Sequence, residues 1–149
     1  MENTRELFQI LTRRFGFLSK NCCSIGEFEI SMIHSHILFE VERRNLPSMQ
    51  EVAEALGTDI TTFSRQVQNL IKMKLVEKTP HEEDRRVQLL SLTTQGKFVT
   101  GAIDQQMKDY LEEIFSHLSP EDREKVLQSI KLLNDAMAKS SRCCQPNMF

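Results

Sequence analysis

Four cysteines fall in two adjacent pairs, Cys22-Cys23 and Cys143-Cys144. A disulfide within such a pair closes a strained ring, so each pair is better suited to donating sulfur jointly to a soft, thiophilic ion or to bridging elsewhere in an assembly. The spacing is not that of a zinc finger. We therefore regard all four as candidates for sensing a soft metal, a metalloid or an oxidant, with Cys22 and Cys23 as the metal ligands if there is one. The alternative is that they are small core residues.

A second group of polar side chains lies between about Asp59 and Lys74. In this segment Ile60, Phe63, Val67, Leu70 and Ile71 recur at three- and four-residue steps, which predicts a helix with these residues buried. After Asp59 its other face holds hydroxyls, amides and cations but no carboxylate, and such groups bind base edges and phosphates. The ordinary alternative is a solvated helix face. The candidate DNA contacts here are Thr61, Thr62, Ser64, Arg65, Gln66, Asn69 and Lys72.

The third group lies in the polar run 80–86, between the β-prone segments 75–79 and 87–92. This pattern predicts a hairpin with a long tip. Asp84 can accept hydrogen bonds from Arg86, two residues on, and hold that guanidinium extended toward a narrow, negatively charged minor groove. Lys78, His81 and Arg85 are then expected to contact phosphates, which position a protein without reading sequence. Taken alone, an Asp-Arg-Arg run is a surface ion pair of little energetic value.

The segment before the polar helix predicts a partner helix. Ser48 and Glu51 have the spacing of a capping box, apolar residues follow at helical steps from Met49 to Leu56, and Gly57 ends the pattern. Two helices joined by a short turn and followed by a hairpin make a winged helix-turn-helix. Its second helix enters the major groove of DNA.

Further helices are predicted on both sides. Thr4 is expected to cap the first, residues 27–44 form a second that is apolar around much of its circumference, a long helix follows Gly96, and Ser119 with Pro120 begins the last. The first and the last two have wide apolar faces with little left to cover them, so we expect them to pair with a second copy. The expected fold is mainly α, a single domain 1–149, with dimerisation helices at 1–26 and 97–149 and the winged helix-turn-helix at 27–96.

Composition is compatible with this organisation. The chain has 149 residues, 40% of them hydrophobic, enough for one core. Its net charge is −2, but segment 43–97 holds nine Lys/Arg and seven Asp/Glu, whereas the remaining residues hold ten and fourteen. The proposed reading region is thus the more basic part, which favours moderate, salt-sensitive DNA affinity. We expect a cytoplasmic protein without a signal peptide or membrane span.

The order of these features resembles the multiple-antibiotic-resistance regulator (MarR) family of winged-helix repressors. The resemblance rests on the two helices, the Leu75-Val76 strand, the Asp84-Arg85-Arg86 wing and the Leu92-Thr93-x-x-Gly96 exit. It implies that Ser64 and Arg65 match the family's Thr-Arg in the recognition helix, and that Asp84 and Arg86 match its wing pair. It also implies dimerisation through the terminal helices, with effectors bound near Cys22-Cys23. One departure is the absence of the Gly that commonly precedes Leu75-Val76.

These observations predict a homodimeric repressor that binds a pseudo-palindromic operator in double-stranded DNA. A small molecule, metalloid or oxidant would release it, and no cofactor is expected to be required. His34 and His36 point to different sides of a helix and His117 is isolated, so these histidines are expected to be structural or incidental. One alternative is a thiol-based redox enzyme, although no Cys-x-x-Cys motif, Gly-rich phosphate loop or catalytic acid/base pair supports it. Another is a winged-helix module for protein contacts alone.

Overall fold

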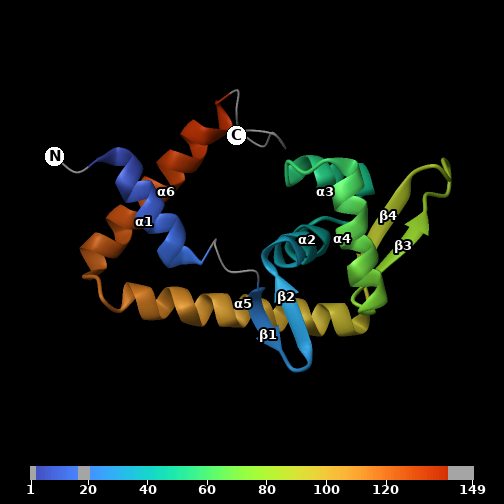
Figure 1. Ribbon diagram of the computed structural model, residues 1–149, viewed down its shortest axis with the longest axis horizontal. Coiled ribbons are helices and arrows are strands. Elements are labelled where there is room, and N and C mark those ends of the chain that lie inside the picture. The colour runs from blue at the N-terminus through green and yellow to red at the C-terminus, as the bar shows by residue number, and fades with distance from the viewer. Residues whose placement is uncertain (1–2, 17–20, 141–149) are drawn as a thin grey trace.

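The computed structural model describes residues 3–16 and 21–140, and Figure 1 shows their arrangement. Within these ranges no helix is long and apolar enough to cross a membrane. The elements follow in the order α1 (Thr4–Phe15), β1 (Asn21–Ile25), β2 (Phe28–Ser31), α2 (Met32–Arg43), α3 (Met49–Ala55), α4 (Ile60–Lys72), β3 (Val76–Pro80), β4 (Gln88–Leu92), α5 (Thr94–Phe115) and α6 (Pro120–Ala138).

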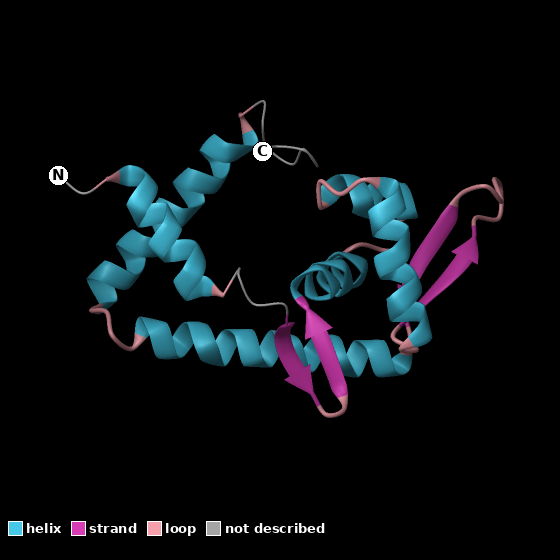
Figure 2. Cartoon of the chain, viewed as in Figure 1, coloured by secondary structure: helices cyan, strands magenta, loops and turns pink. Residues whose placement is uncertain are grey.

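The predicted winged helix-turn-helix is present. Strands β3 and β4 pair antiparallel from Val76↔Leu92 to Pro80↔Gln88, and the wing extends away from the helices (Figures 1 and 2). A backbone hydrogen bond of 2.8 Å from Leu90 N to Pro47 O fastens the wing to the segment that leads into α3. The core beneath α4 consists of fully buried side chains from every part of this region: Ile37, Leu38, Val52, Phe63, Val67, Leu70, Leu75, Leu90 and Val99.

Side-chain caps fix where α3 and α4 begin. The Ser48 hydroxyl accepts a hydrogen bond of 3.1 Å from Glu51 N, as predicted, and the Asp59 carboxylate accepts one of 3.0 Å from Thr62 N. This bond lowers the pKa of Asp59, because it stabilises the charged form. Gly57 has a left-handed φ of 62°, which ends α3 as the sequence indicated.

The end of α4 explains the missing glycine of the sequence. Lys74 has a φ of 60°, the left-handed conformation that glycine adopts most easily. Lys74 N donates to Ile71 O at 2.9 Å, and Leu75 N donates to Leu70 O at 3.0 Å. These are the two bonds of a Schellman motif, and buried Leu70 and Leu75 supply its hydrophobic contact. A lysine therefore adopts the turn that the family resemblance assigns to glycine.

The predicted helix 27–44 is wrong in its first turns. Residues 28–31 form β2, which pairs antiparallel with β1 through a turn at Gly26, so Cys22-Cys23 lies in a strand instead of a loop. The apolar residues of this segment fit either period: Ile30 is buried while Glu29 is exposed, which is strand alternation. Helix α2 begins only after Ser31, whose hydroxyl accepts from His34 N at 3.2 Å.

Two further boundaries differ from the prediction. Helix α1 is capped by Asn3, whose side chain accepts from Arg5 N, and Thr4 is its first residue. Helix α5 begins at Thr94, so Gly96 lies inside the helix instead of before it. The first half of α5 is buried at Gly96, Val99, Thr100 and Ile103, so it belongs to the winged core. The predicted division between residues 96 and 97 therefore falls within one continuous helix.

The terminal helices stand apart from this core. In Figure 1 α1 crosses α6 at one end of α5, while the winged region occupies the other end. Ser119 caps α6 and Pro120 is its first residue, as predicted. Neither α1 nor α6 contains a buried residue within the described chain. Both helices are amphipathic, so they carry apolar surface that a single copy leaves exposed.

Candidate nucleic-acid interface

Helix α4 presents most of the predicted polar side chains to solvent. Thr61, Thr62, Ser64, Arg65, Asn69 and Lys72 are all exposed, and Gln68 joins them. Gln66 differs from this set, because it is half-buried and lies beside His34 on α2. The helix buries Phe63, Val67 and Leu70 beneath it, which leaves the polar side free for a ligand.

Ile60 is not buried, which contradicts the prediction. As the first residue of α4 it precedes the part of the helix that packs on the core, and 46% of its surface is exposed. Ile60, Thr61, Ser64, Arg65 and Gln68 together line an open hollow of about 530 Å³. A hollow with an apolar edge, two hydroxyls, an amide and a guanidinium offers groups for both hydrogen-bonding base edges and the methyl group of thymine.

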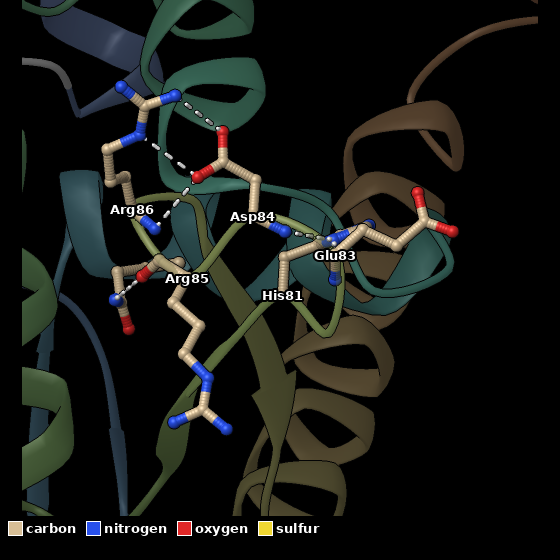
Figure 3. A network of polar contacts seen from close by, with 6 residues as sticks. His81, Glu83, Asp84, Arg85 and Arg86 are labelled. Carbon is tan, nitrogen blue, oxygen red and sulfur yellow. Dashed lines mark hydrogen bonds and ion pairs between the residues drawn. The ribbon is translucent and has the colours of Figure 1, made fainter.

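The wing holds Arg86 in a fixed relationship to Asp84 (Figure 3). Arg86 Nε donates to Asp84 Oδ1 at 3.1 Å, a terminal guanidinium nitrogen donates to Oδ2 at 3.3 Å, and Arg86 N donates to Oδ1 at 3.1 Å. The predicted hydrogen bonding of this pair is confirmed. The pKa of Asp84 is lowered, chiefly by the guanidinium and then by the backbone N–H of Arg86. The Arg86 side chain remains 91% exposed, so it is oriented without being buried.

The other predicted wing contacts lie around this pair. Arg85 is exposed, and in Figure 3 its side chain extends away from the Asp84–Arg86 pair. Lys78 is exposed on β3. His81 differs, because its Nδ1 faces into the loop and accepts from Glu83 N at 3.1 Å and from Asp84 N at 3.4 Å. The imidazole therefore has a structural role that the sequence pattern did not indicate.

Only part of the predicted thiol site is described. Cys23 is half-buried in β1 and lines a cavity of about 160 Å³ with Ile103, Gln106, Met107 and Tyr110 of α5. The side chain of Cys22 and the pair Cys143-Cys144 lie outside the described residues. Within the described part of the chain no three His, Cys, Asp or Glu residues form a cluster that could hold a metal ion. Joint binding by the thiols stays a prediction.

The histidines do not form a common site. Both ring nitrogens of His34 are buried, and neither makes a hydrogen bond within the described part of the chain. Burial lowers the pKa of His34, and the nearby Gln66 side chain opposes that shift in part. His36 is exposed on the same helix, and His117 is exposed after α5.

A cavity of about 440 Å³, larger than the one that Cys23 lines, lies where α1, α2 and α5 meet. Its walls are mostly apolar, and Glu42, Asp104 and His36 are among the residues that line it. The sequence did not reveal it, because a cavity formed by three separate helices has no local pattern. The residues that line it are Phe15, Met32, Ser35, His36, Leu38, Phe39, Glu42, Thr100, Ile103, Asp104 and Met107.

Comparison with known proteins agrees with this geometry. A model of the MarR family matches residues 28–87. The HTH-type transcriptional regulator TcaR of Staphylococcus aureus is 29% identical over 111 residues, which are 73% of this chain and 73% of TcaR. FabT of Streptococcus pneumoniae, solved in complex with DNA, superimposes with a TM-score of 0.77 at 20% identity over 90% of this chain and 94% of that one. The MepR–DNA complex of S. aureus gives 0.75 at 20% identity over 91% and 99%.

Proposed function

We propose that this chain is a winged-helix transcriptional regulator of the MarR family, whose model matches residues 28–87, and that it acts as a homodimeric repressor on a pseudo-palindromic operator in double-stranded DNA. The observation that carries the proposal is that two surfaces suited to contact DNA, the exposed face of α4 and the wing, lie on one core. The exposed polar face of α4 supplies base contacts from Ser64 and Arg65. The wing beside it supplies Arg86, already extended by Asp84, for the minor groove.

The dimer is inferred from the surface of the terminal helices. Leu7, Phe8 and Leu11 of α1 are 47%, 44% and 55% exposed, and Leu127, Ile130, Leu133 and Met137 of α6 are exposed to a similar extent. Covering these side chains with a second copy removes apolar surface from water, which is favourable. Two-fold symmetry would also set two α4 helices one turn of DNA apart. The similar FabT and MepR structures are complexes with DNA, which is consistent with this arrangement.

Release from DNA is proposed to follow from a ligand in the 440 Å³ cavity. The cavity joins α1, near the proposed dimer surface, to α2 and α5, whose other residues form the winged core. A ligand that binds the cavity at only one angle between these helices favours the conformation with that angle, in both protomers. The apolar walls and the carboxylates of Glu42 and Asp104 favour an apolar molecule with a positive charge. Reversing a 99:1 preference requires a differential affinity of about 5.5 kcal/mol.

A thiol mechanism is the second proposal, supported by the position of Cys23 against α5. Gln106 of α5 donates to Ser24 O at 3.3 Å, and Tyr110 donates to Arg14 O at 3.3 Å. These bonds fasten β1 and the end of α1 to α5 around the small cavity that Cys23 lines. Oxidation or metal binding at Cys23 would enlarge that side chain and displace β1 from α5. Soft metals and metalloids favour thiolate ligands, so arsenite is a suitable probe of metal binding. Thiolates are also the form of cysteine that oxidants attack, so peroxide is a suitable probe of oxidation.

A mobility-shift assay with random DNA and with DNA from upstream of the gene, at two salt concentrations, tests the central proposal. The expected result is tighter binding to the upstream DNA, with an affinity that falls as salt rises. Equal affinity for both DNAs contradicts sequence-specific regulation. Sedimentation at micromolar protein tests the dimer, and a monomer mass that does not change with concentration contradicts it.

The release mechanisms are separated by cysteine variants. The double variant Cys22→Ser/Cys23→Ser should retain DNA binding and lose release by arsenite or peroxide. The matched control is Cys143→Ser/Cys144→Ser, which should still respond. Unchanged release from the Cys22/Cys23 double variant rejects the thiol mechanism and leaves the cavity as the effector site.

A further inference from the structure

The imidazole of His81 organises the tip of the wing. The loop from residue 81 to 87 is closed by a hydrogen bond of 2.8 Å from His81 N to Val87 O. Inside this loop, His81 Nδ1 accepts from the backbone N–H groups of Glu83 and Asp84, at 3.1 and 3.4 Å. In Figure 3 the ring lies beside these amides on one side of Asp84, and the side chain of Arg86 lies on the other side. His81 is half-buried there, although the loop is otherwise mostly exposed.

These contacts fix the protonation of the ring. A neutral imidazole has one acceptor nitrogen and one donor nitrogen, so Nδ1 accepts and Nε2 carries the proton. A protonated imidazole has two donors and cannot accept at Nδ1. The observed loop therefore requires neutral His81. A cation placed here to contact phosphate would not make these bonds.

We propose that His81 is a positioning residue for DNA recognition by the wing, because its neutral ring holds the backbone of Asp84 and thereby aims the Asp84–Arg86 pair. The inference rests on the proposed function in one respect: the direction of Arg86 matters only if the wing meets DNA. The steps are continuous, since Nδ1 binds Asp84 N and the Asp84 carboxylate binds three N–H groups of Arg86. An ordered guanidinium loses less entropy when it enters the minor groove.

Protonation of His81 has two opposing effects on DNA binding. It removes both loop hydrogen bonds, but it also adds a positive charge beside DNA phosphates. The wing tip projects away from the helices, so the charged groups around the ring are those of the loop itself (Figure 1). They are Glu82, Glu83, Asp84, Arg85 and Arg86. The decisive comparison is therefore made between variants at one pH, so that these two effects are not mixed.

Three substitutions separate the positioning role from a phosphate contact. His81→Asn keeps a side-chain oxygen that can accept from N–H groups two or three residues on. His81→Phe keeps a ring without an acceptor, and His81→Lys supplies a cation without one. Affinity for DNA selected from a random pool should be unchanged in His81→Asn. It should be about 3- to 10-fold weaker in His81→Phe and His81→Lys, the effect of losing ordinary hydrogen bonds. Binding by His81→Lys that equals or exceeds the wild type, with weaker binding by His81→Asn, overturns the proposal.

An experiment without DNA tests the same residue independently. The backbone amides of Glu83 and Asp84, followed by NMR hydrogen exchange at one pH, should exchange slowly in the wild-type protein and in His81→Asn and faster in His81→Phe, because only the first two keep an acceptor for these N–H groups. His117→Phe, which changes an exposed histidine far along the chain, should exchange like the wild type. Equal exchange of these amides in the wild type and in His81→Phe overturns the proposal. If the amides exchange as expected but the wild type binds no selected DNA, the proposed function fails and the loop assignment stands.

Discussion

Thr93 donates a hydrogen bond of 2.7 Å from its hydroxyl to the carbonyl oxygen of Lys74, 19 residues earlier in the chain. Its backbone N–H donates to Leu75 O at 3.1 Å, and its hydroxyl accepts from Gly96 N at 2.9 Å. One residue thus ends the wing, caps α5 and holds the C-terminal end of α4. Because α5 continues to the terminal helices, this junction is where a movement of those helices would reach the recognition helix.

Removing the Thr93 hydroxyl should therefore weaken the whole winged region. Thr93→Val keeps the branched shape but loses both the cap and the bond to Lys74, and should reduce the free energy of unfolding by about 1–2 kcal/mol. Thr93→Ser keeps the hydroxyl and serves as the control. Urea denaturation measures the difference. Equal stability of the two variants would show that the junction contributes nothing measurable.

Two glycines of α5 offer a matched test of packing at this junction. A Cβ on Gly96 would overlap the carbonyl oxygen of Leu75, whereas a Cβ on Gly101 would meet no atom within 4 Å. Gly96→Ala should destabilise the protein by about 2–3 kcal/mol, because backbone must move to admit the methyl group. Gly101→Ala should stabilise it by about 0.5–1 kcal/mol, since alanine favours a helix. Thermal unfolding of both variants checks the opposite signs.

The left-handed residue at the end of α4 is a site for stabilisation. Lys74→Gly should relieve the steric cost of a φ of 60° and raise the free energy of unfolding by about 0.5–1 kcal/mol. Lys72→Gly is the contrasting control, because Lys72 has helical geometry and glycine should cost about 1 kcal/mol there. A loss of stability in Lys74→Gly would mean that lysine is not strained in this turn.

The sequence predicted the parts of the fold that local patterns determine. Ser48, Asp59 and Ser119 stand at helix starts, and Asp84 and Arg86 are two residues apart, so each signal involves neighbours in the chain. The predicted wing followed from the change of period, whereas the register of its strands was not predicted. These features depend on short-range chemistry, which one sequence contains in full.

The missed features depend on distant segments. Strand β2 was predicted as helix because Phe28 and Ile30 suit both periods, and only contact with the rest of the core decides between them. Ile60 fits the apolar period of α4 but lies beyond the surface that the core covers. The inward role of His81 depends on loop backbone geometry, and the cavity of α1, α2 and α5 depends on the crossing of helices far apart in sequence.

Exposed Ile60 is expected to contribute to sequence preference through thymine. Its apolar surface at the edge of the α4 hollow can pack against a thymine methyl group in the major groove. Replacing thymine by deoxyuridine in the selected DNA should then weaken wild-type binding by about 1 kcal/mol, roughly the value of one buried methyl group. Ile60→Ala should bind both DNAs alike. An equal loss for the wild type and Ile60→Ala would remove Ile60 from the interface.

Arg65 and Arg86 should affect DNA binding in different ways. Arg65→Ala on α4 should cost about 1–3 kcal/mol and relax the sequence preference, because its expected target is a base edge. Arg86→Ala should weaken binding with less change of major-groove preference, because its expected target is the minor groove. Asp84→Ala should reproduce part of the Arg86→Ala effect by freeing the guanidinium. Lys108→Ala, which removes an exposed cation on α5, should change neither property.

The pH dependence of the Asp84–Arg86 pair separates its contribution from that of His81. The pKa of Asp84 is lowered in the folded protein, so the stabilisation of the pair is present above the usual carboxyl range of about 4 and is lost only as pH falls through the lowered value. Between about pH 5 and pH 8 the pair should therefore stay ionised. In a mobility-shift titration, the affinity ratio of wild type to Asp84→Ala, both carrying His81→Asn, should be constant across this interval. A ratio that changes several-fold would mean that Asp84 itself titrates there and that the guanidinium does not hold it ionised.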